Sequence, residues 1–186
     1  MSETTAVPAP RRESRPGAES RLENGPAVQT TPAAVGSSDG RPFVVVGVDG
    51  SASAEAAVDW AAEECARRGA RLVLLHVREP VVGSVLTVES RRYRARSVGD
   101  TVGDLWEQVN QLRESRVDAE GQVEEGTPEQ VLIMASEDAE LLVVGAEGTG
   151  RHRGLLLGEV AQECARAAVC PVVIIPPPGG RQGVTA

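Results

Sequence analysis

The chain has 186 residues, 41% of them hydrophobic but only 2% aromatic, so we expect one domain with an aliphatic core and flanking segments. Its formal net charge is −8 and it contains no lysine, which argues against a general electrostatic attraction to nucleic acid or to anionic membranes. The sequence has neither an apolar run long enough to span a bilayer nor a signal-peptide pattern. Its three cysteines lack metal-ligand spacing, so we expect reduced thiols and a cytoplasmic protein.

Two segments of biased composition flank the predicted domain, which covers residues 41–176. Residues 1–40 are rich in Pro, Ala, Ser, Thr, Gly and Glu, and their four arginines nearly balance five acids. Such a segment buries too little apolar surface to offset the entropy of ordering, so we predict a disordered, solubilising tail. A docking segment or a phosphorylation target is the alternative. Residues 177–186 are predicted to be a second disordered tail.

The first half of the domain reads as strand, helix and strand. Residues 43–48 form an apolar run typical of a central parallel strand, followed by Asp49. Ser51 or Ser53 can cap a helix over residues 54–68, whose apolar residues recur at helical spacing and which Gly69 ends. Residues 71–77 are the second strand, and the three segments together predict a right-handed βαβ unit.

The middle of the chain is less regular. Residues 78–99 contain four closely spaced arginines, Arg91, Arg92, Arg94 and Arg96, which form a solvated basic loop or grip an anionic group. A helix begins at Asp100 or Thr101 and runs to about residue 114. Residues 116–124 alternate in polarity, as an edge strand does. Thr127 is then expected to cap a helix over residues 128–136.

The most informative stretch is residues 141–175. An apolar strand, residues 141–144, leads into a loop with glycines at 145, 148, 150 and 154. A helix over residues 159–168 follows Gly158, and residues 172–175 form a last strand. Backbone amides in such a loop can surround a phosphate, and the start of the following helix favours negative charge.

Taken in order, these segments predict a single doubly wound, Rossmann-like α/β domain. Its five-stranded parallel sheet would have the strand order 3-2-1-4-5 with helices on both faces. Ligands bind such sheets beyond the carboxyl ends of the strands, where the winding changes direction. Asp49 and Gly145 follow the two strands that flank this point, so we expect both in one site.

Three features of the sequence, a glycine spacing and the two ends of the predicted domain, resemble the universal stress protein family. The spacing Gly145, Gly148, Gly158 is similar to the family's ATP-binding signature G-x2-G-x9-G-[S/T], although Glu159 stands at the Ser/Thr position. VVVGVDGS with LLHV, and LLLGEV with CPVVII, are similar to the family's opening and closing segments. The resemblance implies that the chain binds ATP or another adenine nucleotide, with or without Mg²⁺. It implies a nucleotide site made of Gly47, Asp49, Val77, Val144, Gly145, Gly148, Arg151, Gly158, Glu159 and Val160.

The resemblance also gives these residues roles. Asp49 would hold the nucleoside, Val77 would border the adenine, and the glycine loop would surround the phosphates. Glu159 cannot donate a hydrogen bond from its side chain and places a charge near them, at a cost of roughly 1 kcal/mol in bulk water at 4 Å and roughly 4 at an effective dielectric of 20. A metal bridging carboxylate and phosphate would reverse that effect. Alternatively, Glu159 is simply a good partner for the helix dipole.

Two further functions stay open at this stage. A relative that binds no ATP would act through dimerisation and protein partners, and a slow ATP hydrolase is the remaining possibility. We assign no catalytic residue and no metal ligand, because no nucleophile elbow, Walker motif or His/Cys cluster is present. A homodimer is expected through residues 172–175, because an uncovered apolar edge strand invites pairing with a second copy.

Overall fold

The computed structural model describes residues 40–79, 102–149 and 157–179. The five strands are β1 (Phe43–Val48), β2 (Arg71–Arg78), β3 (Ala119–Glu125), β4 (Leu141–Gly145) and β5 (Val172–Ile175). The helices are α1 (Ala52–Arg68), α3 (Pro128–Ala135) and α4 (Glu159–Ala167), and residues 102–114 are also helical. The arginine cluster at 91–96 lies outside the described residues, as do residues 1–39 of the predicted tail over 1–40 and residues 180–186 of the one over 177–186.

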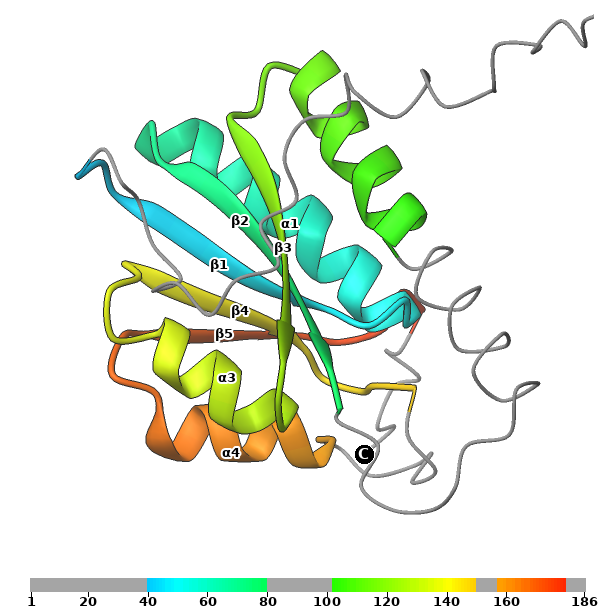
Figure 1. The fold of residues 1–186 in the computed structure, drawn as a ribbon, viewed down its shortest axis with the longest axis vertical. Helices are drawn as coiled ribbons and strands as arrows, with labels where there is room; N and C mark the ends of the chain where they lie inside the picture. Colours follow the sequence, from blue (N-terminus) through cyan, green and yellow to red (C-terminus); the bar gives the residue numbers. More distant parts are fainter. Residues whose placement is uncertain (1–39, 80–101, 150–156, 180–186) are drawn as a thin grey trace, which may run out of the picture.

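The strands form one parallel sheet in the order β3-β2-β1-β4-β5, which confirms the predicted fold. Figure 1 shows α1 and the helix at residues 102–114 on one face, and α3 beside α4 on the other. The central position of β1 between β2 and β4 is what makes the winding change direction there. Loops that follow β1 and β4 are therefore neighbours at one end of the sheet.

The core is aliphatic and divides into two layers, one on each face of the sheet. Alternate residues of each strand point to opposite faces, so Val44 and Val46 pack with α1 while Val45 packs with α3 and α4. Leu72, Leu74 and other central strand residues are fully buried. Continuous apolar strands buried on both faces are the expected signature of a parallel sheet covered by helices.

Ser51 and Gly69 cap the two ends of α1, as the sequence predicted. The Ser51 hydroxyl accepts a hydrogen bond from the Ala54 N–H at 3.2 Å, so Ser51 is the N-cap and Ser53 is buried instead. At the other end, Gly69 has φ 66° and its N–H bonds to the Cys65 carbonyl. Because a left-handed φ favours glycine, Gly69 ends the helix at little cost.

Two local predictions were wrong. The third strand begins at Ala119 rather than residue 116, because Arg116 has φ 64° and belongs to the turn that ends the preceding helix. Thr127 occupies the N-cap position of α3, but its side chain makes no capping hydrogen bond. Pro128 is the first residue of α3, as predicted. No helix among the described residues is both long enough and apolar enough to cross a membrane.

Candidate functional site

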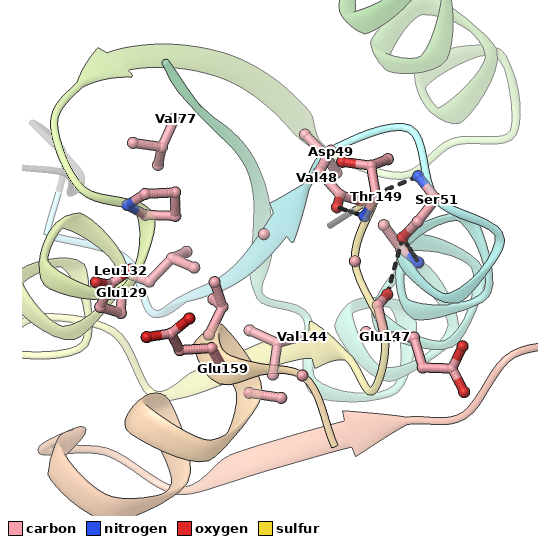
Figure 2. Close-up of a pocket in the computed structure, with 18 of the residues that line it drawn as sticks. Val48, Asp49, Ser51, Val77, Glu129, Leu132, Val144, Glu147, Thr149 and Glu159 are labelled. Atoms are coloured by element: carbon pink, nitrogen blue, oxygen red, sulfur yellow. Dashed lines mark hydrogen bonds between the residues drawn. The ribbon is translucent and has the colours of Figure 1, made fainter. Parts of the chain in front are cut away.

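A cavity of about 650 Å³ lies where the carboxyl ends of β1, β2 and β4 meet the starts of α1, α3 and α4. Figure 2 shows the side chains that line it, contributed by segments far apart in the sequence. This is the place at which open α/β sheets bind ligands, between strands whose connections run in opposite directions. The cavity is therefore the candidate site.

Nine of the ten predicted site residues line this cavity. They are Gly47, Asp49, Val77, Val144, Gly145, Gly148, Gly158, Glu159 and Val160. The tenth, Arg151, lies outside the described residues.

Asp49 holds the glycine loop next to the end of β1. Its Oδ2 accepts a hydrogen bond from the Thr149 N–H at 2.9 Å, and its Oδ1 accepts one from the Ser51 N–H at 3.0 Å. Both bonds are visible in Figure 2. The carboxylate therefore organises the loops on either side of the cavity as well as lining it.

Ser51 makes a second connection between the same two loops. Its hydroxyl caps α1 and also donates a hydrogen bond to the Glu147 carbonyl at 3.1 Å. This close approach depends on glycine at 145, where a Cβ would lie 2.7 Å from Cβ of Ser53 and 2.9 Å from the Ala54 nitrogen. The sequence predicted Ser51 only as a cap, because its contact with residue 147 depends on the fold.

The start of α4 forms another wall of the cavity. Gly158 is the N-cap, without a side-chain cap, and its N–H donates to the Ala146 carbonyl at 2.7 Å. The first-turn amides of a helix have no partner within the helix and attract negative charge. Here Glu159, an exposed acid in that first turn, already provides it.

The inner wall is apolar. It includes Leu75, Val77, Leu132 and Val144 from two strands and α3. Gly47 keeps this wall open, since a Cβ there would lie 3.2 Å from the Leu132 side chain. A flat, uncharged group such as a nucleobase would bury its faces against these side chains.

The rim carries more acids than the sequence predicted. Asp49 and Glu159 were expected in the site, and Glu147 of the glycine loop, Glu79 after β2 and Glu129 in α3 line the cavity as well. No arginine is among the described lining residues, and the Nδ1 atom of His76 lies 2.9 Å from the Val48 carbonyl oxygen. The described part of the chain has no group of three His, Cys, Asp or Glu side chains placed to hold a metal ion.

Comparison with known proteins identifies this architecture. The profile of the Universal stress protein family matches residues 43–176. The chain belongs to this family. A universal stress protein of Mycobacterium tuberculosis is 35% identical over 139 residues, which cover 71% of this chain and 46% of the relative. Another, from Mycolicibacterium smegmatis, is 33% identical over 144 residues, 75% of this chain and 47% of the relative. This universal stress protein thus spans about half the length of the curated relatives it matches.

Solved structures agree with the fold, and some contain an adenine nucleotide. A universal stress protein in complex with cAMP is 28% identical, with a TM-score of 0.56 over 73% of this chain and 97% of that one. A family protein from Arabidopsis thaliana with AMP bound is 25% identical, with a TM-score of 0.57 over 77% of this chain and 96% of that one. Adenine nucleotides are thus ligands of structural relatives.

Proposed function

We propose that this universal stress protein is a cytoplasmic regulatory module that binds an adenine nucleotide, AMP or ATP. The observation that carries the proposal is the convergence of Asp49, the Gly145–Gly148 segment and the start of α4 around one cavity with an apolar wall. The relatives that contain AMP and cAMP support this choice of ligand. We propose no catalytic residue.

Each part of the cavity suits one part of a nucleotide. Val77 and the other apolar side chains would border the adenine, and Asp49 would face the nucleoside. The backbone at Gly145 and Gly148, together with the first-turn amides at Gly158 and Val160, would face the phosphate end. Arg151 would supply a positive charge to that end, and Mg²⁺ would accompany ATP by bridging its phosphates.

Calorimetry on the full chain tests the proposal, with AMP and ATP titrated in the presence and absence of Mg²⁺. Val77→Trp should fill the apolar end of the cavity and abolish binding. The matched control is Val169→Trp, because Val169 is 70% exposed and does not line the cavity. Binding of neither nucleotide to the wild-type protein would contradict the proposal.

A second function has its own structural support. We propose as the alternative a universal stress protein that binds no ATP and acts through dimerisation and protein partners. β5 lies at the end of the sheet, and among the described strands it pairs only with β4, which leaves one edge of residues 172–175 for a second copy. Glu159, in place of a hydroxyl, is the feature of the cavity that favours this alternative.

A further inference from the structure

Two carboxylates face the cavity from neighbouring helices. Glu129 lies in the first turn of α3 and Glu159 in the first turn of α4, and the two helices pack side by side (Figure 1). Figure 2 shows both side chains on the same side of the cavity. In the portion of the chain that the structure describes, neither carboxylate takes part in a hydrogen bond or ion pair. Both therefore stay available to act on the charge of a ligand.

The size of the cavity does not discriminate among adenine ligands. About 650 Å³ is within the usual range of roughly 300–1,000 Å³ for small-molecule sites, so it admits a nucleoside and a nucleoside triphosphate alike. Selection among these ligands must then come from the chemistry of the wall.

No arginine offsets the acids among the described residues that line the cavity, and the chemistry of these residues disfavours accumulated negative charge. Glu79 and Glu147 add to the two helix acids, and both oxygens of Asp49 already accept backbone hydrogen bonds. The positive end of the α4 dipole, which would attract a phosphate, has Glu159 as a resident anion. The apolar wall, by contrast, suits an uncharged base whatever is attached to it.

We infer that this cavity selects its ligand by charge, binding adenosine and adenosine monophosphate in preference to ATP, with Glu129 and Glu159 as the residues that set the preference. The inference rests on the proposed function, because it names the ligand class of the same site. The preferred ligands are then adenosine and AMP, and each added phosphate weakens binding.

Titrations of the full chain with adenosine, AMP and ATP, in the presence of a chelator, test the inference. Affinity should fall in that order. Because salt screens repulsion between exposed charges, ATP affinity should rise with ionic strength while adenosine affinity stays constant. A site dominated by attraction to phosphate shows the opposite salt dependence, so the sign of the change is decisive.

Neutral variants locate the effect. Glu159→Gln and Glu129→Gln should each strengthen ATP binding by about 5-fold, the value for one unit charge at about 4 Å in water, and leave adenosine binding unchanged. Glu137→Gln is the matched control, because Glu137 is exposed just beyond α3 and does not line the cavity. It should change nothing.

The outcomes separate the two proposals. Wild-type protein that binds ATP as tightly as adenosine, or glutamine variants that bind ATP no better, overturns the charge selection and leaves the proposed function standing. If neither AMP nor ATP binds to the wild-type protein, the proposed function is wrong, and if adenosine does not bind either, this inference is wrong with it.

Discussion

The Asp49 carboxylate accepts a hydrogen bond from the Thr149 backbone N–H, although 100 residues separate the two in the sequence. The bond joins the loop after β1 to the glycine loop after β4, and the Asp49 contact with Ser51 fixes the carboxylate from the other side. Asp49 therefore shapes the cavity by positioning the backbone of residues 146–149, in addition to lining it.

This relationship makes Asp49→Ala a test of how much the loop geometry matters. Losing both hydrogen bonds should loosen residues 146–149 and weaken adenosine binding by about 10-fold. Two buried hydrogen bonds to a charged group would cost more, but Asp49 is exposed. Adenosine is the appropriate probe because it carries no charge of its own. Calorimetry and amide hydrogen exchange measure the two effects.

The control for that variant is Asp59→Ala, since Asp59 is exposed on α1 and lies outside the cavity. Adenosine affinity should be unaffected there. Unchanged affinity and unchanged exchange rates in Asp49→Ala would show that the loop keeps its conformation without the carboxylate.

A pair of glycine substitutions tests the packing between the glycine loop and α1. Gly145→Ala should lower the free energy of unfolding by about 1–3 kcal/mol, because its Cβ would meet backbone atoms of Ser53 and Ala54 at 2.9 Å. Gly103→Ala, in a helix and with no atom within 4 Å of the new Cβ, should raise it by about 0.5–1 kcal/mol. Urea unfolding measures both, and equal effects would contradict the crowding at Gly145.

The sequence predicted the sheet well because its signals are local and strong. β1 and β5 have the predicted bounds, since Pro42 and Asp49 flank the apolar run of β1, and Pro171 and Pro176 flank that of β5. The start of β3 was missed because Arg116 adopts a left-handed φ, which residue type alone does not signal for arginine.

The site was predictable only as far as strand order could place it. Asp49 and Gly145 were expected together because both follow neighbouring strands, and they do line one cavity. Glu129 carries no sequence signal linking it to Glu159, because only the packing of α3 beside α4 brings the first turns of these helices to the same cavity. The hydrogen bond between Thr149 and Asp49 depends on the loop conformation, so the sequence did not predict it either.

Two buried thiols give the folded protein a pH dependence. Burial raises the pKa of the Cys65 thiol to about 12 and that of Cys164 to about 11, from a usual value of 9.0. Above pH 9 the unfolded chain loses these protons first, so the free energy of unfolding should fall as pH rises from about 9 to about 12, while below 9 these thiols have no effect. Denaturant titrations across this range check the slope.

Cysteine variants show which groups are responsible. Cys65→Ala and Cys164→Ala should each be less stable at neutral pH but lose less stability on going above pH 9, because the titrating thiol is gone. Cys170→Ala is the comparison. Burial raises the pKa of the Cys170 thiol too, but this residue is only partly buried, so its removal should reduce the slope less. The same alkaline slope in all three variants would mean that other groups cause it.

The free edge of β5 predicts a homodimer. The carbonyls of Pro171 and Ile175 accept hydrogen bonds from the N–H groups of Leu142 in β4 and Ala146 directly after it. By alternation, the backbone groups of residue 174 point to the other edge. Ile174→Pro removes a donor from that edge and should convert a dimer into a monomer at micromolar concentration. Ile174→Thr loses the same apolar side chain but keeps the donor, and it should remain a dimer. Sedimentation equilibrium distinguishes the species, and a wild-type monomer would contradict the prediction.

Two replacements of Glu159 both remove its charge, but only one of them supplies a hydroxyl. Glu159→Gln removes the charge, whereas Glu159→Ser removes it and adds a small hydroxyl directly after Gly158, beside the first-turn amides of α4. In the presence of a chelator, ATP should bind to the serine variant more tightly than to the glutamine variant by a few-fold, the usual value of one hydrogen bond, and more tightly than to the wild-type protein by at least about 5-fold. The gain should be smaller for AMP, since the repulsion acts mainly on the outer phosphates.

Repeating the titrations with Mg²⁺ separates repulsion from metal bridging. If Glu159 recruits a metal to the phosphates, the serine variant will bind ATP more weakly than the wild-type protein once Mg²⁺ is present. That result would contradict the prediction that Glu159 acts on ATP by repulsion.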